Sequence, residues 1–253
     1  MRLLTQARDL RRRRAREERG VFVAEGVRAV EELLRSPLVV RGVLVAPQLA
    51  GAQRGAALRE RLATSGLEVL DVSERDFGSA AETESPQGVL AIAEIPSRAF
   101  PEPAAGAIVR VVVLDAVQDP GNVGTIIRTA AALGADATVA LPGTVDLWNA
   151  KVIRGAMGAH FHHSAFATTL DDLRAWAARF DVSLWGADSS GEPFAREAPP
   201  PARVALCVGN EGAGLTTDVR TACGRLLAIP VSGAVESLNV AVATGILLHA
   251  VRP

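Results

Sequence analysis

Apolar residues recur along the chain at two spacings, and these spacings predict an alternation of strands and helices. Short runs with few polar interruptions are typical of strands buried in a sheet, whereas recurrence every three or four residues is typical of helices. The first half predicts both kinds of element in alternation: strands at 21–24, 39–45, 67–72 and 89–95, and helices at 3–19, 27–35 and 54–63. Alternating elements of this size favour a small α/β domain.

The second half repeats the alternation around more strongly apolar strands. Residues 108–114, IVRVVVL, form a nearly continuous apolar run of the kind found in buried parallel strands. The pattern predicts further strands at 137–141, 161–166, 182–187 and 204–208, and helices at 123–133, 147–157 and 170–179. We therefore expect a second α/β domain with a mostly parallel sheet.

The last stretch, 229–251, begins at the end of a strand and continues through a glycine-containing loop into an apolar helix. Ser237 and Asn239 stand where that helix begins. Ser and Asn are common N-caps, whose side chains accept hydrogen bonds from unpaired backbone N–H groups. A ligand site at the same place is compatible with capping. His249, alone within this apolar helix, is expected to pack in the core.

A segment rich in Pro and Ala, PSRAFPEPAAG at 96–106, separates the two halves. Such a composition is typical of a linker. The chain has 253 residues, which is enough for two modest domains with a core each. We predict an N-terminal domain at 1–95 and a C-terminal domain at 107–253.

The formal net charge of -1 argues against a uniformly basic surface, but the charge is unevenly distributed. Seven arginines lie between residues 8 and 19. Four of them recur every three or four residues and therefore share one face of the predicted helix: Arg8, Arg12, Arg16 and Arg19. A solvated charged face explains this pattern, and so does a face that contacts RNA phosphates, because guanidinium groups suit phosphate oxygens.

Several classes of protein are disfavoured by the sequence. Cys207 and Cys223 do not suggest a disulfide framework, which fits a reducing cytoplasm. No apolar stretch resembles a signal peptide or a membrane span. His160, His162 and His163 lie close together, but no Cys or carboxylate completes a familiar ligand spacing, so we expect no metal.

Three loops are predicted at the carboxyl ends of strands, where ligands bind in open parallel sheets. They are 115–122, 209–214 (GNEGAG) and 230–236. A tight glycine loop lets backbone groups approach a ligand closely. GNEGAG is neither the GxGxxG of dinucleotide sites nor the GxxxxGK[ST] of P-loops, so neither of those sites is supported.

Three segments stand out as a set: DPGNVGTIIRTAAALGAD, LCVGNEGAGL and IPVSGAVESLNVAVA. In this order and spacing they resemble the three motifs of the SpoU-type (TrmH-like) RNA 2′-O-ribose methyltransferases of the SPOUT superfamily. WNAKVIRGAMGAHF at 148–161 is similar to the family's intermediate segment. The N-terminal half is similar to the substrate-binding domain of many members, most visibly in FVAEG at 22–26 and SPQGV at 85–89.

The resemblance implies a C-terminal α/β trefoil-knot (SPOUT) methyltransferase domain, with the knot near 204–251, preceded by a small α/β RNA-binding domain. It implies S-adenosylmethionine as the methyl donor, held by the knotted loops. It also implies a homodimer in which both subunits contribute residues to each active site. Structured RNA is the implied partner, and no membrane is.

The resemblance assigns five residues to catalysis: Asn122, Arg128, Glu211, Ser237 and Asn239. In the family, Arg128 is proposed to activate the ribose hydroxyl, although a guanidinium is a poor base at neutral pH. Stabilisation of the developing alkoxide is an equally good role. The same side chains also have ordinary structural interpretations: a surface ion pair for Arg128, an Asx-turn for Asn122, and a solvated loop position for Glu211.

The family contacts its donor chiefly through backbone atoms and apolar packing, at positions that match Gly209, Asn210, Ile229, Pro230 and Leu238. Lys151 and Arg154 lie on the intermediate helix. They are candidates for contacts with RNA phosphates, and ordinary surface charge explains them equally well.

We therefore predict a cytoplasmic two-domain enzyme that transfers a methyl group from S-adenosylmethionine to a ribose 2′-hydroxyl of ribosomal RNA. The attached N-terminal domain favours ribosomal over transfer RNA, because it is commoner on that branch of the family. The alternatives are a tRNA 2′-O-methyltransferase and an antibiotic-resistance rRNA methyltransferase. A non-catalytic RNA-binding or ribosome-assembly protein is the alternative of another class.

Overall fold

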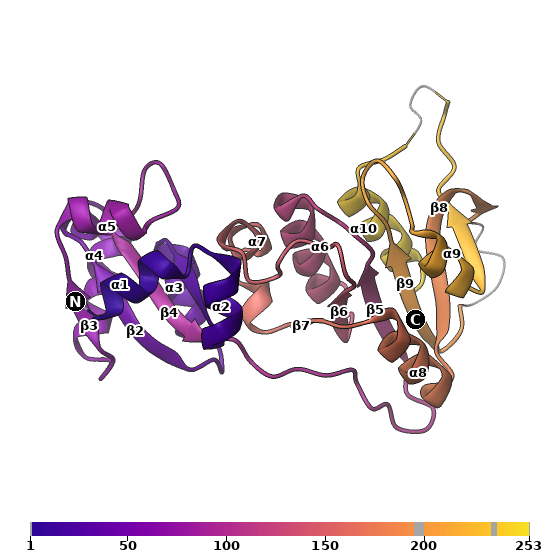
Figure 1. Cartoon of the computed structure of the whole chain (residues 1–253), viewed down its shortest axis with the longest axis horizontal. Coiled ribbons are helices and arrows are strands. Elements are labelled where there is room, and N and C mark those ends of the chain that lie inside the picture. Colours follow the sequence, from indigo (N-terminus) through magenta and orange to yellow (C-terminus); the bar gives the residue numbers. More distant parts are fainter. Residues whose placement is uncertain (1, 195–199, 234–236, 253) are drawn as a thin grey trace. The chain divides into compact units, whose positions relative to one another are not determined.

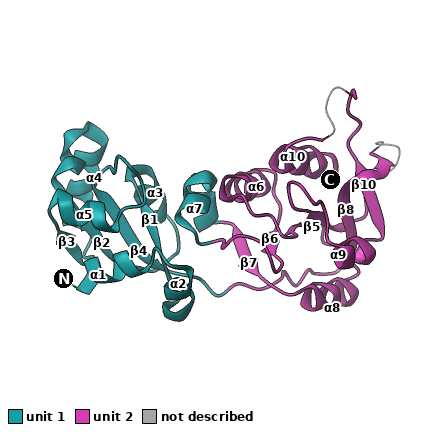
Figure 2. Cartoon of the chain, turned by 45° about the horizontal axis from the view of Figure 1, so that its top comes forward, with its two compact units in different colours: residues 1–97, 148–162 teal, residues 98–147, 163–253 magenta. Residues whose placement is uncertain are grey.

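The structure, a computed structural model, describes residues 2–194, 200–233 and 237–252. The chain divides into two compact units, one made of residues 1–97 with 148–162 and the other of residues 98–147 with 163–253 (Figure 2). Each unit contains one sheet. The segment 148–162, which the sequence places in the C-terminal half, thus packs with the N-terminal unit.

The N-terminal unit is built on a four-stranded mixed sheet (Figure 1). In spatial order its strands are β1 (Val21–Glu25), β4 (Val89–Glu94), β2 (Val40–Val45) and β3 (Val69–Asp71), all labelled in Figure 2. β4 runs antiparallel to both of its neighbours, and β2 runs parallel to β3. Every residue of β4 from Val89 to Ala93 is fully buried, as its continuous apolar run predicts.

Helices flank this sheet as the sequence pattern predicts, with two additions. The elements are α1 (Arg2–Asp9), α2 (Arg13–Arg19), α3 (Val27–Leu33), the 3₁₀ turn η1 (Pro47–Gly51), α4 (Gln53–Ala63) and α5 (Glu74–Ala80). The sequence pattern missed η1 and α5. The second of these has a recognisable start, because the Ser73 hydroxyl accepts a hydrogen bond from the Asp76 backbone N–H at 3.1 Å.

The prediction of one helix over 3–19 is wrong, because the chain turns between α1 and α2 and Arg16 points inward. Arg16 is only 4% exposed, and its guanidinium donates to the backbone oxygens of Leu10 (2.6 Å) and Arg11 (3.1 Å). These bonds satisfy carbonyl groups that a continuous helix would pair itself. The predicted single face of four arginines therefore does not form.

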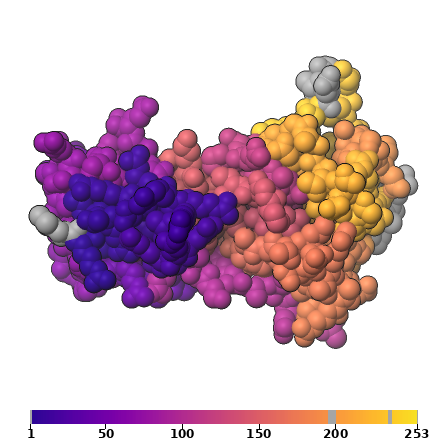
Figure 3. Space-filling view, in the orientation of Figure 1, coloured from indigo at the N-terminus to yellow at the C-terminus, as the bar shows by residue number. Residues whose placement is uncertain are grey.

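The other three arginines of that predicted face stay near the surface but pair within the unit. Arg8 donates to Ser79 Oγ and to an oxygen of Asp76, at 2.7 and 3.0 Å. Arg12 and Arg19 bind the two carboxylate oxygens of one residue, Asp9. In Figure 3 the first residues of the chain, in indigo, form a continuous part of the visible surface of this unit.

An aromatic stack holds the segment 148–162 on the N-terminal unit. The segment contains α7 (Ala150–Ala156) and the 3₁₀ turn η2 (Ala159–Phe161). The ring of Phe22 lies 4.5 Å from Trp148 and 5.9 Å from Phe161, and Trp148 stacks on His160 at 4.2 Å. All four side chains are buried, so this apolar contact explains why the segment joins the unit of β1.

The C-terminal unit is built on a six-stranded sheet in which every neighbouring pair is parallel. The order across the sheet is β10 (Arg225–Ala228), β8 (Ser183–Pro193), β9 (Arg203–Val208), β5 (Val109–Leu114), β6 (Ala137–Ala140) and β7 (Ser164–Ala167); Figure 2 labels β10, and Figure 1 labels the other five. The mostly parallel sheet predicted for the second half is therefore confirmed. β8 is longer than predicted, and β7 begins later because η2 occupies 159–161.

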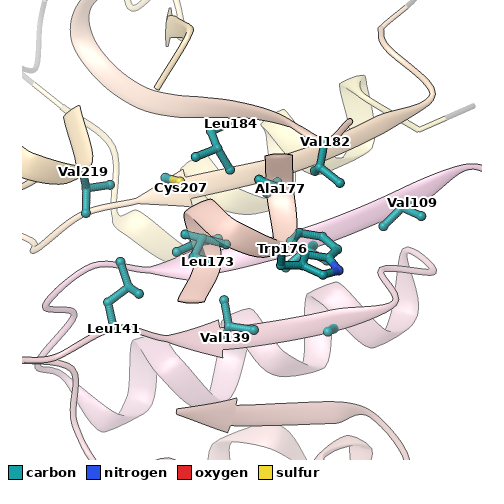
Figure 4. Packing of buried hydrophobic residues seen from close by; sticks show 14 of the residues in the cluster. Val109, Val139, Leu141, Leu173, Trp176, Ala177, Val182, Leu184, Cys207 and Val219 are labelled. Atoms are coloured by element: carbon teal, nitrogen blue, oxygen red, sulfur yellow. The ribbon is translucent and has the colours of Figure 1, made fainter. Parts of the chain in front are cut away.

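Four helices accompany this sheet: α6 (Pro120–Ala132), α8 (Leu170–Phe180), α9 (Thr217–Ala222) and α10 (Val240–Ala250). Leu173 and Trp176 of α8 pack against the sheet beside Val139 (Figure 4). Part of the predicted linker joins the same core, because the ring of Phe100 stacks on Trp176 at 4.7 Å. The predicted boundaries, 1–95 and 107–253, remain a prediction about independently folding domains.

Arg110 ties the end of the chain to the start of the central strand. It is 4% exposed, and its guanidinium donates to the carbonyl oxygens of Val251 (2.6 Å), Ala202 (2.6 Å) and Val109 (2.8 Å). Charged donors make the stronger hydrogen bonds in proteins. The segment that follows the last helix is thereby fixed to β5.

The prediction that His249 packs in the core is wrong. Its side chain is exposed, on the same face of α10 as Val242 and Ile246, which are 52% and 44% exposed. One face of α10 therefore carries apolar side chains that its own unit leaves exposed. Over the described ranges, no helix is both long and apolar enough to cross a bilayer. Nor, among the same residues, do three His, Cys, Asp or Glu side chains gather as metal ligands.

We expect His163 to make stability depend on pH. Burial, together with the charge of Arg98, lowers the pKa of His163 to about 4, and its ring accepts or donates a hydrogen bond at Thr138 Oγ1. An unfolded histidine keeps a pKa of about 6.5, so between pH 6.5 and 4 only the unfolded chain takes up the proton. The stability contributed by neutral His163 is complete above pH 6.5 and falls as the pH drops, by roughly 3 kcal/mol at pH 4.

Denaturant unfolding at pH 7 and pH 5 measures this dependence. Wild type is expected to lose about 2 kcal/mol more than His163→Asn between these two pH values. Equal losses in the two proteins would show that His163 titrates normally in the folded chain.

Candidate functional site

The predicted loops 115–122 and 209–214 meet at the carboxyl ends of the parallel strands, as the topology requires. Of the third predicted loop, 230–236, residues 234–236 lie outside the described residues. A cavity of about 570 Å³ opens at these strand ends within the C-terminal unit. Its walls come from the end of β9 with the loop 209–214, from β8, and from the segments that flank β10 and open α10. Polar and apolar side chains line it together, so it suits a ligand that carries both kinds of surface.

Gly209 closes the loop 209–214 tightly on itself. A Cβ atom at this position would lie 2.2 Å from the carbonyl carbon of Gly214 and 2.4 Å from the nitrogen of Leu215. Next to it, the backbones of Asn210 and Gly214 exchange two hydrogen bonds of 2.9 Å. Only glycine fits where two backbones approach this closely.

Asn210 lines the cavity, and its side chain stabilises the loop. Its side-chain oxygen accepts from the N–H groups of Gly212 and Ala213, both at 3.0 Å, and its nitrogen donates to the carbonyl of Ala116 at 3.0 Å. Both ends of the amide are thus committed within the chain. The expected contact of Asn210 with a donor molecule would therefore be made by its backbone.

Glu211 reaches from this loop to the start of α6. Its carboxylate accepts from the side chain of Asn122 (3.0 Å) and from the backbone N–H groups of Asp119 (3.2 Å) and Gln118 (3.4 Å). Burial raises the pKa of Glu211, but these donors outweigh burial and leave the pKa below its usual value. The ionised carboxylate is therefore a fixed anchor for α6.

Asn239 extends this chain of hydrogen bonds to the start of α10. Its side-chain oxygen caps α10, accepting from Ala241 N at 2.9 Å and Val242 N at 3.3 Å, so the predicted N-cap is confirmed. Because the oxygen is occupied, the amide nitrogen is free to donate, and it does so to Asn122 Oδ1 at 2.9 Å. The side-chain nitrogen of Asn122 in turn donates to the carboxylate of Glu211. Both hydrogen bonds therefore point in the same direction, from Asn239 through Asn122 to Glu211.

Ser237 and Arg128 lie apart from this hydrogen-bonded chain. Ser237 is exposed and lines the cavity two residues before the cap. Arg128 is exposed on α6, two turns after its first residues, and is not among the described residues of the cavity wall. The structure therefore joins three of the five predicted catalytic residues directly and places a fourth beside the cavity.

The predicted donor contacts are distributed along the cavity wall. Pro230 does not appear among its described lining residues, whereas the other four predicted contacts do: Gly209, Asn210, Ile229 and Leu238. One wall of the cavity was not predicted from the sequence. It is formed by residues of β8 and α9: Ala187, Asp188, Ser189, Ser190 and Arg220. A loop-like DSSG at the end of an apolar strand was the only available signal.

Comparison with known proteins identifies the family. The model of the SpoU rRNA Methylase family matches residues 109–249, which are more than half of the chain. The chain belongs to the SpoU rRNA methylase family. In this SpoU chain, the model of the MRM3-like substrate binding domain matches residues 3–91. The fold class and the attached N-terminal domain that the motifs implied are thereby confirmed.

Relatives of the SpoU chain match it over nearly its whole length. The 23S rRNA (guanosine(2553)-2′-O)-methyltransferase RlmP of Bacillus subtilis is 37% identical to it, over 96% of this chain and 93% of the relative. The 23S rRNA (uridine(2479)-2′-O)-methyltransferase of Streptomyces viridochromogenes is 29% identical, over 95% and 85%.

A solved structure is similar to the chain over nearly its whole length. The SpoU methyltransferase AviRb from Streptomyces viridochromogenes, crystallised in complex with the cofactor AdoMet, superposes with a TM-score of 0.88 at 28% identity. The match covers 98% of the SpoU chain and 96% of AviRb. The likeness therefore extends across both units of the fold.

Proposed function

We propose that this SpoU-family chain transfers a methyl group from S-adenosylmethionine to a ribose 2′-hydroxyl in 23S ribosomal RNA. The observation that carries the proposal is the chain of hydrogen bonds from Glu211 through Asn122 to Asn239, which joins the loop 209–214 to the first turns of α6 and α10 beside a large cavity. The 2′-O position and the RNA class come from the two relatives. Their targets, a guanosine and a uridine, differ, so the proposal is confined to the RNA class.

The cavity fits S-adenosylmethionine in size and in chemistry. Its volume of about 570 Å³ lies within the range of small-molecule sites. Apolar side chains of Leu227, Ile229 and Leu238 offer a surface for a purine ring, and the backbone of 209–214 offers N–H and C=O groups for polar edges. The donor supplies an electrophilic methyl group on a sulfonium. Ser237, at the same wall, is assigned a polar contact with the donor or the ribose.

We assign Arg128 to the ribose hydroxyl. A guanidinium carries a positive charge, which stabilises the oxygen as its proton passes to solvent water and the oxygen takes the methyl group from the sulfonium. Activation of the hydroxyl and stabilisation of the alkoxide both depend on this charge. Arg128 stands on the helix whose first turn is fixed by Glu211 and Asn239, so the network sets the position of the helix that carries the charge.

The N-terminal unit is proposed to hold structured RNA. The phosphate contacts assigned there are the exposed side chains of the earlier set, with Arg16 removed because it is internal: Arg8, Arg12, Arg19, Lys151 and partly buried Arg154. Ion pairs with Asp9 and Asp76 hold three of these arginines near the surface. A guanidinium in such a pair can exchange its carboxylate for a phosphate, whose oxygens accept from the same N–H groups.

A homodimer is proposed through α10, again as the family resemblance implies. Val242 and Ile246 are four residues apart on one helix face, and both are exposed. Exposed apolar side chains at this spacing favour a contact with another helix. Asn239 begins the same helix, so a partner on this face would lie next to the catalytic residues.

Val242→Glu combined with Ile246→Glu is expected to weaken self-association by about 100-fold or more, because two carboxylates from each subunit would be desolvated in the interface. Light scattering after size exclusion measures the mass as a function of concentration. Val39→Glu is the matched control, since Val39 is 53% exposed but lies in the N-terminal unit. A wild-type mass of one chain at all concentrations, or equal masses for all three proteins, would refute this interface.

The trefoil knot near 204–251 and the cytoplasmic location complete the proposal. The knot is supported by likeness to the SpoU family and by the return of the last residues to β5, where Arg110 binds the carbonyl of Val251. The cytoplasm follows from the proposed substrate, because ribosomal RNA is found there in bacteria.

Titration calorimetry tests the donor half of the proposal. Wild-type protein is expected to bind S-adenosylmethionine, and S-adenosylhomocysteine is expected to compete for the same site. Absence of heat together with absence of competition would refute donor binding and leave the non-catalytic RNA-binding alternative in its place.

A further inference from the structure

One wall of the cavity is a break in the pairing of two strands. β8 and β10 pair in parallel, with Gly186 opposite Leu226, but the next residue, Leu227, pairs with Glu192. Residues 187–191 therefore leave the ladder as an irregular bulge, and four of them line the cavity. Bulges of this kind re-aim the chain locally and are common beside functional sites.

The bulge is held by side chains and not by the ladder. One oxygen of Asp188 accepts from the backbone N–H (2.8 Å) and the hydroxyl (2.7 Å) of Ser190. Arg220, from α9, donates to the other oxygen of Asp188 and to Ser190 Oγ, the latter at 2.8 Å. Asp188, Ser190 and Arg220 all line the cavity.

The electrostatics of this cluster favour a charged pair. Burial raises the pKa of Asp188, but the Ser190 donors and the charge of Arg220 outweigh it and leave the pKa below its usual value. The Asp188 side chain is 11% exposed and that of Arg220 is 42% exposed. Arg220 thus bonds an ionised, mostly buried carboxylate, which is the stronger class of hydrogen bond.

We propose that Arg220 is a positioning residue for the methyl donor, acting through Asp188 to fix the bulge 187–191 as a wall of the cavity. This inference rests on the proposed function, because it takes the cavity as the donor site. Without Arg220, the bulge has its Asp188–Ser190 turn but no bond to α9. The donor would then have to order the wall as it binds, which lowers its affinity.

A neighbouring ion pair provides a matched control. Arg225 of β10 donates to Glu192, the residue at which β8 rejoins the ladder, at 3.0 Å. It therefore also links a β8 carboxylate to an arginine from a later element. Neither Arg225 nor Glu192 is among the described residues that line the cavity.

The test is the dissociation constant of S-adenosylhomocysteine, measured by calorimetry on the full chain. Arg220→Met and Asp188→Asn are each expected to weaken binding by about tenfold, and the double variant by no more than either alone, because the two residues act as one unit. Arg225→Met is expected to stay within about twofold of wild type. Thermal unfolding of all four variants without ligand accompanies the measurement.

Equal affinities for Arg220→Met and Arg225→Met would overturn the inference, and so would additive losses in the double variant. A melting temperature that falls in both Arg220→Met and Asp188→Asn but not in Arg225→Met would show a general structural role and also overturn the inference. In steady-state assays we expect KM for the donor to rise and KM for RNA to stay constant. Failure of wild type itself to bind S-adenosylhomocysteine would refute the proposed function instead.

Discussion

Gly209→Ala is expected to weaken binding of S-adenosylmethionine by on the order of 100-fold or more. The added Cβ would lie 2.2 Å from the carbonyl carbon of Gly214 and 2.3 Å from its oxygen. Both are backbone atoms, so no side-chain rotation relieves the overlap and the loop 209–214 has to open. Opening would break the paired hydrogen bonds between Asn210 and Gly214 and displace Glu211 from α6. Calorimetric titration with the donor measures the effect.

Gly224→Ala is the control for this substitution. Gly224 belongs to the same unit and lies outside the cavity wall, and the nearest atom to a Cβ there is the oxygen of Leu184 at 4.0 Å. It should therefore bind the donor like wild type. Comparable donor affinity in Gly209→Ala and Gly224→Ala would mean that the closed form of the loop is not what the donor binds.

Arg128→Ala is expected to lower the single-turnover rate of methyl transfer by about 10²- to 10³-fold, the loss typical of removing one electrostatic contact to a developing oxyanion. The donor dissociation constant should change little, because Arg128 is not among the described residues that line the cavity. Incorporation of labelled methyl groups into RNA measures the rate, and calorimetry measures the affinity.

Arg179→Ala, which removes an exposed arginine of α8 paired with Glu102 at 3.7 Å, is the matched control and should retain the wild-type rate. Arg128→Lys distinguishes charge from geometry, since lysine keeps the positive charge but lacks the planar fork. If Arg128→Ala methylates RNA as fast as Arg179→Ala does, the catalytic assignment of Arg128 is wrong.

The network at the site could be predicted in part from the sequence. Asn122, Glu211 and Asn239 each follow the end of an apolar strand, and in a parallel sheet such ends lie on one edge. The shared edge predicts that the three segments lie close together, and the family motifs indicate which of their residues are functional. The direction of the hydrogen bonds was not predictable, because it depends on which oxygen caps α10.

The missed wall of the cavity shows why pattern alone is insufficient. Asp188 and Arg220 meet only because β8 leaves its pairing with β10 over residues 187–191. Strand register between segments this far apart depends on tertiary packing, which periodicity does not encode. Gly191 was a possible signal, since a Cβ there would lie 2.6 Å from the backbone of Leu226.

The prediction of one helix for the arginine-rich N-terminal segment was wrong for a related reason. Helical spacing over 3–19 correctly predicted the helical residues but not the turn between α1 and α2. That turn is stabilised by Arg16, a residue type that is rarely buried and whose role here is to bind two backbone oxygens. The spacing of the arginines predicted that Arg16 is exposed, whereas its guanidinium is buried and binds backbone oxygens.

The most direct test of the proposed function is nucleotide-resolved mapping of 2′-O-methyl groups on 23S ribosomal RNA incubated with the purified chain and S-adenosylmethionine. RNA that lacks this modification is the substrate, and mass spectrometry of nuclease fragments reads the product. Wild type is expected to add a 2′-O-methyl group at a defined nucleotide, and Arg128→Ala is expected to add almost none in the same time. No methylation by wild type, or methyl groups on bases instead of riboses, would contradict the assignment.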